Sequence, residues 1–458
     1  MKKILTLLLA LWMLTGCVAM AAGNQLVVGS TTAMSGAFFT DLFGSNTADM
    51  DVRALLHGYN LMSWDHETGT YQINDSVVAG MAVSRDAQNN RVYTFDLYGD
   101  LKFSDGSAIT AKDYAFSILL TASPELAKLG GQSAAVGAIL GMDAYQSGKS
   151  SVLRGVRLLS DTQMSITISK AYEPYFYEMA LFDYSPYPIS VLAPGCKVVD
   201  TEKGVGIVNA GGTGTAIFTA DLLQKTILDA ATGYMSHPSV VSGPYTLTSY
   251  DAQSGTASFA INPYYKGNED GEKPTIETIV YRSVANDEAI DLLLSGEVDL
   301  LNKMVAADTV SKGIQSIADQ PFSVANYPRS GLSMISFSCE RQTVSGKAVR
   351  QAIANCFDRD ALVKAYTGNF GLKANGYFGI GQWMYQLAAG TIPPPVADLP
   401  ANATAKETAA YEKTVAQWDA LSLDKLKDYP LDLDQAAKLL DQDEWRLGKD
   451  GIRAKKID

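Results

Sequence analysis

The sequence has few of the residues that catalytic and metal sites usually require. It contains three histidines and four cysteines among 458 residues. None of His57, His66 and His237 has a partner at a spacing typical of zinc ligands, and we interpret the segment around His66 as a solvated turn. No Gly-x-Ser-x-Gly elbow and no phosphate-binding loop occurs. We therefore expect no enzyme, no metal and no cofactor.

Clusters of positive charge are also missing. The net charge is -12, and the acidic residues are spread along the chain. Nucleic acids and anionic lipid headgroups bind to basic patches, so we expect neither as a partner. The chain is too long for one compact core, and about two or three domains are expected.

A long apolar run occurs only at the N-terminus. Lys2 and Lys3 precede the apolar stretch Ile4 to Leu14, which is too short to span a bilayer but suits a signal peptide. The sequence Leu14 to Cys17 matches a bacterial lipoprotein cleavage site, so we expect residues 1–22 to be a signal peptide and anchor region with acyl chains on Cys17. The alternative is ordinary cleavage after Ala19 to Ala21, which leaves a product without an anchor.

Three cysteines remain once Cys17 is assigned to lipid, namely Cys196, Cys339 and Cys356. An odd number leaves at least one thiol outside any intramolecular disulfide. One disulfide is permitted, and the sequence does not choose the pair. We favour buried free thiols, because Cys339 lies in an apolar, strand-like run and Cys356 lies on a predicted helix face.

Strand and helix signals are interleaved, which predicts a mixed α/β, multi-domain chain. Strands are predicted at Leu26–Gly29, Leu153–Ile168, Ile276–Tyr281 and Met334–Phe337, and a hairpin at Val92–Phe103 leads into a turn at Ser104–Gly106. Helices are predicted after Thr110 with Asp113 in a capping box, across Lys347–Tyr366 with a break at Asp358, at Lys406–Leu423, and after Asp432 with Gln435.

A series of motifs follows in a fixed order along the chain. They are Ala79–Ser84, Tyr93–Tyr98 with Leu101–Asp113, Val241–Tyr245, Asn262–Tyr265, Leu293–Asp299, and Arg350–Ile353 with Asp358–Asp360. Together they resemble the family 5 extracellular solute-binding proteins, the group of oligopeptide-, dipeptide- and nickel-binding receptors of ABC transporters. Each motif alone is weak, but the ordered set over roughly residues 50–365 is specific.

The resemblance implies an α/β, two-lobed fold of the periplasmic-binding-protein type (class II), with an extra inserted subdomain. It implies a first lobe at residues 23–50 and 184–280, the inserted subdomain at 51–183 and the second lobe at 281–458. The strands near Ile276 to Arg282 are expected to act as the hinge.

The function that the resemblance implies is capture of oligopeptides or dipeptides for an ABC importer. The expected partners are a peptide, the permease subunits and, through the lipid anchor, the outer face or periplasmic side of the cytoplasmic membrane; a monomer is expected. The alternatives are a non-peptide solute (a nickel chelate, haem or an oligosaccharide) and a lipoprotein that senses peptides or acts as a chaperone.

The segment Asp432–Asp458 resembles a segment that, in members of the family, is followed by many more residues. The second lobe is therefore expected to be incomplete here, with weak peptide binding if the natural product ends at Asp458. The acidic residue that the family uses for the peptide amino group lies in that further part, so no residue of this sequence is given the role.

Ligand contacts are expected on segments that present extended backbone or aromatic rings to the cleft. In the small-residue segment after the first strand the candidates are Thr32, Met34, Ser35 and Gly36, although a plain Gly/Ser loop explains it equally well. Aromatic candidates, for which core packing is the alternative role, are Tyr234, Tyr245, Trp383 and Tyr385.

Overall fold

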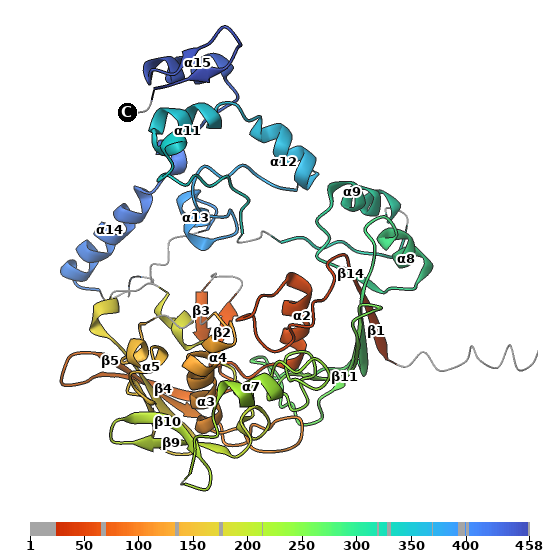
Figure 1. Ribbon diagram of the computed structural model, residues 1–458, viewed down its shortest axis with the longest axis vertical. Coiled ribbons are helices and arrows are strands. Elements are labelled where there is room, and N and C mark those ends of the chain that lie inside the picture. The colour runs from red at the N-terminus through yellow and green to blue at the C-terminus, as the bar shows by residue number, and fades with distance from the viewer. Residues whose placement is uncertain are drawn as a thin grey trace, which may run out of the picture. The chain divides into compact units, whose positions relative to one another are not determined.

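The computed structural model describes residues 24–456 except 66–69, 133–136, 174–176, 213, 318–319, 328–330, 369, 393–398 and 400–402. The chain divides into two compact units, Met1–Met304 (unit 1) and Val305–Asp458 (unit 2) (Figure 1). The predicted signal peptide, Cys17 and His66 lie outside the described residues. Among those described, no helix has the length and apolar character needed to cross a bilayer.

Unit 1 contains a mixed five-stranded sheet in the order β11-β12-β13-β1-β14. Strand β1 is parallel to β13 and β14, whereas β11, β12 and β13 are antiparallel neighbours. The strands predicted near Leu26 and Ile276 are confirmed as β1 and β13. The bounds are β1 (Gln25–Ser30), β11 (Tyr245–Asp251), β12 (Thr256–Ile261), β13 (Thr278–Ser283) and β14 (Leu300–Asn302).

Helix α2 (Thr47–Leu56) packs beside this sheet and shares a hydrophobic core with it. Val52 and Leu56 are fully buried and stand one helical turn apart, so they lie on the same face of the helix. They pack with Phe259 and Tyr281 of the sheet in one buried cluster. This packing holds α2 against the sheet, and the first turn of α2 supports the candidate site.

A second hydrophobic core of unit 1 joins smaller sheets to helix α3 (Ala111–Thr121). The sheets have the strand orders β4-β5-β8-β7, β6-β10-β9 and β2-β3. Their strands are β2 (Met62–Asp65), β3 (Thr70–Ile73), β4 (Val78–Arg85), β5 (Arg91–Leu97), β6 (Val152–Leu153), β7 (Val156–Leu158), β8 (Gln163–Ile168), β9 (Cys196–Thr201) and β10 (Gly204–Asn209). The predicted cap of α3 is confirmed, since the Thr110 N–H donates to Asp113 Oδ2 at 2.8 Å.

The hairpin predicted within Val92–Phe103 is wrong. Strand β5 pairs with β4 and β8 instead, and the chain after it forms an isolated bridge between Lys102 and Ala108. The turn predicted at Ser104–Gly106 is confirmed, with a positive φ of 85° at Gly106. The preceding strand β4 and the more distant β8 therefore form the hydrogen bonds that the sequence pattern assigned to the segment after β5.

Short helices connect the strands of unit 1. They are α4 (Pro124–Lys128), α5 (Met142–Gln146), η1 (Lys170–Tyr172), η2 (Glu178–Phe182), α6 (Ile189–Leu192), α7 (Ala220–Thr226) and α8 (Ala289–Ser295). Helix α7 contacts α4 and α6 and precedes one wall of the candidate site.

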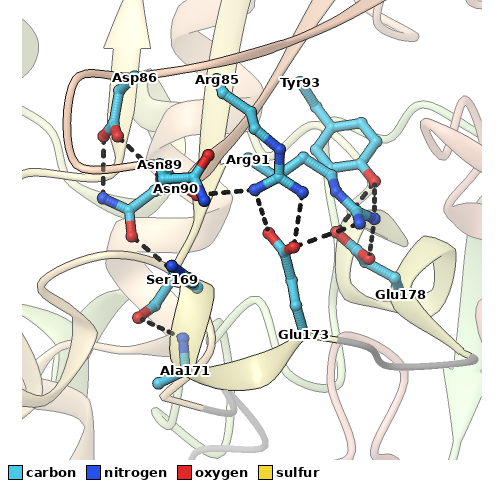
Figure 2. Close-up of polar contacts among 11 residues, drawn as sticks. Arg85, Asp86, Asn89, Asn90, Arg91, Tyr93, Ser169, Ala171, Glu173 and Glu178 are labelled. Atoms are coloured by element: carbon cyan, nitrogen blue, oxygen red, sulfur yellow. Dashed lines mark hydrogen bonds and ion pairs between the residues drawn. The ribbon is translucent and has the colours of Figure 1, made fainter.

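An ion-pair cluster ties the turn between β4 and β5 to the segment around η1 and η2 (Figure 2). Arg85 contacts both carboxylate oxygens of Glu173, at 3.1 and 2.7 Å, and Arg91 contacts Glu178 at 2.6 Å. The Tyr93 hydroxyl also donates to Glu178, at 2.9 Å. Each of these charged groups has an opposite partner, so we interpret the cluster as structural.

Unit 2 is mainly helical within its described residues. Its elements are α9 (Ala307–Ser316), α10 (Gln342–Ser345), α11 (Lys347–Ala354), α12 (Arg359–Thr367), α13 (Trp383–Ala388), α14 (Ala405–Asp419), η3 (Leu423–Lys425), α15 (Leu433–Gln442), β15 (Arg446–Leu447) and β16 (Arg453–Ala454). The predicted pair of helices with its break at Asp358 is confirmed, as are the caps by Asp358 and Asp432, which accept from the N–H groups of Ala361 and Gln435.

Two predictions for unit 2 are wrong. Met334–Phe337 forms no strand, because no described segment pairs with it. Cys339 and Cys356 are exposed rather than buried, while Cys196 in unit 1 is buried; all three are free. The large buried apolar side chains of unit 2 are few among its described residues, namely Val349, Trp383 and Leu387.

Candidate functional site

A cavity of about 330 Å³ opens in unit 1 beside the loop that follows β1. Ser35, Gly36 and Ala37 of this loop form one wall, continued by Phe43 and Gly44. The opposite wall comes from the segment after α7, with Leu228, Asp229, Ala230, Met235 and Ser236. Segments almost 200 residues apart in the sequence therefore share one cavity.

The loop wall is held by Asp49, a fully buried residue in the first turn of α2. Its Oδ1 accepts the N–H groups of Ser35 (2.8 Å) and Gly36 (3.2 Å), and its Oδ2 accepts the Ser35 hydroxyl (2.6 Å) and the Asn46 N–H (3.2 Å). One carboxylate thus satisfies four donors, three of them backbone groups that the loop would otherwise leave unpaired. Asp49 therefore fixes the conformation of this loop, and contact of the loop with a ligand stays a prediction.

Two further bonds fix the same loop. Arg53, one turn further along α2, donates through Nη1 to the Ala37 carbonyl at 2.7 Å. The Phe38 N–H donates to the Met235 carbonyl at 2.9 Å, which links the two walls of the cavity directly. The loop and the 228–236 segment are therefore one unit of structure.

An aromatic cluster lies next to this link. The Phe39 ring packs edge-on against Tyr187 and Tyr234, with ring centroids 4.7 and 5.0 Å apart, and against His57 at 5.9 Å. Such edge-to-face pairs add to the free energy of burial. Tyr234 therefore packs in the core that supports the cavity.

Glycine at position 36 has a direct structural reason. Its φ is +86°, and a Cβ there would come within 3.3 Å of the Tyr250 ring and 3.5 Å of the Ser236 Cβ. A side chain at this position would strain the backbone and fill space at the junction of the walls.

The structure brings together some of the predicted ligand contacts and not others. Ser35 and Gly36 line the cavity. Thr32 is partly buried and bonds to Ser30, whereas Met34 packs in the core of the five-stranded sheet. Buried Tyr245 donates its hydroxyl to the Ile276 carbonyl at 2.9 Å. Ligand contact stays a prediction for all six candidates of unit 1, namely Thr32, Met34, Ser35, Gly36, Tyr234 and Tyr245.

The remaining candidates belong to unit 2. Trp383 begins α13 and is 8% exposed, and Tyr385 on the same helix is half-buried. Unit 2 also has an open cavity of about 450 Å³ between α9 and α12, lined by residues such as Asp308, Ser311 and Lys364. Neither aromatic residue lines it, and a role of Trp383 or Tyr385 in ligand binding stays a prediction.

The sequence analysis did not predict three residues of the site or its support, namely Asp49, Asp229 and Met235. For Asp49 a signal was present, because Asn46 and Asp49 have the spacing of a capping box at the start of a helix. Asp229 gave none, since an aspartate after a helix is typical of an ordinary turn.

His57 is a titratable group in the support of the loop. Its Nε2 donates to the Phe38 carbonyl at 3.0 Å. Burial lowers the pKa of His57 to about 4; the Phe38 carbonyl raises it in part, and the charge of Arg53 lowers it further. The folded protein therefore holds a neutral imidazole under conditions in which an unfolded chain would protonate it.

Acidification is expected to destabilise unit 1 through His57 by about 2 kcal/mol between about pH 7 and about pH 4.5. The unfolded state gains a proton near pH 6.5 and the folded state only near pH 4, so the stability present above pH 6.5 is lost as the pH falls. The full pKa difference corresponds to roughly 3 kcal/mol, which we reduce because the side chain is only half-buried.

Asp113 has the opposite effect on stability as the pH falls. Burial raises its pKa to about 6, so the folded state takes up this proton before the unfolded state does. Urea unfolding of the parent protein and of His57→Gln at each pH separates the two, because the Asp113 contribution cancels in the difference. A pH-independent difference between these proteins would contradict the prediction.

Comparison with known proteins identifies the family to which the chain belongs. The family model for bacterial extracellular solute-binding proteins, family 5 (middle), matches residues 76–457. The chain belongs to this family of solute-binding proteins, which confirms the resemblance inferred from the ordered motifs. The family is a class of extracytoplasmic binding proteins rather than of enzymes.

Two relatives are oligopeptide-binding proteins named OppA. The protein of Lactococcus lactis subsp. lactis (strain IL1403) is 25% identical over 391 residues, covering 82% of this chain and 53% of the relative. The periplasmic protein of Escherichia coli (strain K12) is 24% identical over 305 residues, covering 65% and 48%. The chain spans about half the length of the curated relatives that it matches.

Solved structures confirm the fold class. Lactococcal OppA, in a closed conformation with an endogenous peptide, aligns with a TM-score of 0.63 at 20% identity over 94% of this chain and 69% of that one. NikZ of Campylobacter jejuni, in complex with Ni(L-His), aligns with a TM-score of 0.55 at 15% identity over 94% and 65%. The predicted α/β, periplasmic-binding-protein-like fold is therefore confirmed.

Proposed function

We propose that this protein is the substrate-binding component of an ABC importer, which captures oligopeptides or dipeptides and delivers them to permease subunits. Family membership supports a binding role, and the relatives' names support peptides as the ligand class. Catalysis has no place in this proposal.

The observation that carries the proposal is the state of the loop wall. The Ser35 and Gly36 N–H groups are taken by Asp49, and the Ala37 carbonyl by Arg53. Among the described residues, the Ser35 and Gly36 carbonyls accept no hydrogen bond, although both residues line the cavity. Fixed backbone acceptors suit the N–H donors that all peptides share, whatever their side chains.

The lobes, the hinge and the membrane anchor are proposed from the sequence. Residues 23–50 and 184–280 would form the first lobe, 51–183 the inserted subdomain and 281–458 the second lobe, with a hinge near Ile276 to Arg282. Acyl chains on Cys17 would hold a monomer at the outer face of the cytoplasmic membrane or on the periplasmic side. A ligand would favour the closed state only through contacts that the open state lacks.

Mass spectrometry of small molecules that co-purify with the full chain tests this function. We expect a mixture of short peptides, because backbone recognition tolerates many side chains. Recovery of a single non-peptide solute, such as a nickel chelate, haem or an oligosaccharide, would overturn the peptide assignment. Peptide-dependent uptake lost on gene deletion would support import over a sensing or chaperone role.

A further inference from the structure

The cavity of unit 1 has a charge of one sign. Asp229 is the charged residue among those that line it, and the polar side chains beside it are Ser35 and Ser236. The other walls are small or apolar, including Phe43 and Met235. No lysine or arginine among the described residues lines the cavity, so an anionic ligand group would find no cationic partner there.

The Asp229 carboxylate is fixed through one oxygen. Its Oδ1 accepts the N–H groups of Ala231 (3.0 Å) and Thr232 (2.9 Å) and the Thr232 hydroxyl (2.9 Å). Its Oδ2 has no hydrogen-bond or ion-pair partner among the described residues. The bonds from Thr232 and then Ala231 lower the pKa of Asp229, so the negative charge persists in mildly acidic surroundings.

We propose that this cavity is a side-chain subsite for a cationic residue of the bound peptide, with an ammonium or guanidinium group placed at Asp229 Oδ2. The inference rests on the proposed function and adds a side-chain preference to it. An unbranched apolar stem suits the walls formed by Ala37, Met235 and Phe43, and the ring of Phe43 attracts a cation placed over its face.

The site is open, which sets the size of the effect. Asp229 is exposed at the cavity rim, and ion pairs of this kind change affinity by about three- to fivefold. The preference is expected to weaken as ionic strength rises, because the charges are accessible to solvent. The subsite therefore biases the ligand choice of a broad receptor and does not restrict it to one peptide.

The test uses tripeptides of alanine in which lysine or norleucine, which has a similar stem but no charge, replaces each position in turn. Dissociation constants are measured with the full chain by saturation-transfer NMR. We expect lysine to bind about three- to fivefold more tightly than norleucine at one position. In Asp229→Asn this ratio should fall to about one, because asparagine retains an Oδ1 acceptor for the turn but has no charge.

Asp270→Asn serves as the matched control, since Asp270 is exposed in the same unit and does not line the cavity; its ratio should equal that of the parent. Ala230→Arg, which puts a cation at the rim, should make norleucine the better ligand. Equal binding of lysine and norleucine peptides, or a lysine preference that survives in Asp229→Asn, would overturn the subsite alone. Failure of every peptide to bind would overturn the proposed function, and the subsite with it.

Discussion

Replacing Gly243 by alanine is expected to lower the free energy of unfolding of unit 1 by about 4 kcal/mol. A Cβ at this position would lie 2.5 Å from the Leu55 carbonyl oxygen, 2.5 Å from the Leu56 carbonyl carbon and 2.8 Å from the His57 nitrogen. All three are backbone atoms at the end of α2, so rotation of a side chain cannot relieve the clash.

The close approach at Gly243 closes the core around α2. The Gly243 N–H donates to the Leu56 carbonyl at 2.8 Å, and the Ser242 hydroxyl bonds to both backbone groups of Gly58, at 3.1 and 3.0 Å. Asn262, in another of the family motifs, donates to the Gly243 carbonyl at 2.9 Å. The motif around Gly243 thus meets the end of α2, and the motif that begins at Asn262 holds it there, so displacement of Gly243 disturbs these bonds.

Urea unfolding and expression yield measure the effect. Gly211→Ala is the control, because a Cβ at that exposed position has nothing within 4 Å; we expect a change within about 0.5 kcal/mol. If Gly243→Ala does not fold, Ser242→Ala still tests the closure and should cost about 1–2 kcal/mol through its lost bonds. Parent-like stability of both Gly243→Ala and Ser242→Ala would show that this contact is dispensable.

Local features of the fold were predictable from the sequence. The caps at Thr110, Asp358 and Asp432 depend on side chains within three residues of the helix start, so their signals are contained in short segments. The turn at Gly106 was predictable for the same reason, since a positive φ favours glycine there.

Pairing between distant segments was harder to predict from the sequence. The strand pattern of Val92–Leu97 was correct, but one of its partners, β8, lies far along the chain, and that pairing depends on packing that no local pattern encodes. Met334–Phe337 has the composition of a strand, yet a strand requires a hydrogen-bonded neighbour, and none lies among the described residues. Burial of Cys339 failed with it, because that prediction assumed the strand.

The candidate site was predictable on one wall. The small residues at Ser35 and Gly36 marked a backbone-presenting loop, and both line the cavity. The opposite wall was not predictable, because Asp229 and Ser236 lie near the loop through tertiary contacts, such as the bond from the Phe38 N–H to the Met235 carbonyl. The buried aromatic residues illustrate the same problem, since Tyr234 supports the site from the core.

Replacing Asp49 by alanine is expected to destabilise unit 1 by about 3 kcal/mol and to disorder the loop wall. The change removes the acceptor of the Ser35 and Gly36 N–H groups and of the Asn46 N–H. Each unsatisfied donor costs about 1–3 kcal/mol when it is buried, and less where water replaces the carboxylate. Gly36 is buried whereas Ser35 is exposed, so we expect a value between these limits.

Asp49→Asn separates charge from hydrogen bonding. Its Oδ1 still accepts from Ser35 and Gly36, but its amide group faces the Asn46 N–H, which is also a donor, so we expect a loss of about 1–2 kcal/mol. Ser35→Ala removes only the hydroxyl bond to Asp49 and should cost about 1 kcal/mol. Urea unfolding measures the loss of stability in the three variants, which should be largest in Asp49→Ala, smaller in Asp49→Asn and smallest in Ser35→Ala. A smaller loss in Asp49→Ala than in Ser35→Ala would contradict this prediction.

Asp49 also connects stability to binding, because it does not itself line the cavity but holds Ser35 and Gly36, which do. Loss of the carboxylate frees the Ser35 and Gly36 carbonyls to reorient, so peptide affinity should fall for every peptide by a similar factor of about ten, without a change in side-chain preference. Asp229→Asn should change the preference instead. Peptide titrations of Asp49→Ala, below the temperature at which it unfolds, distinguish the two, because alanine removes the acceptor of the Ser35 and Gly36 N–H groups: a uniform loss assigns Asp49 to the backbone-presenting loop, and unchanged affinity would mean that the loop does not contact the ligand.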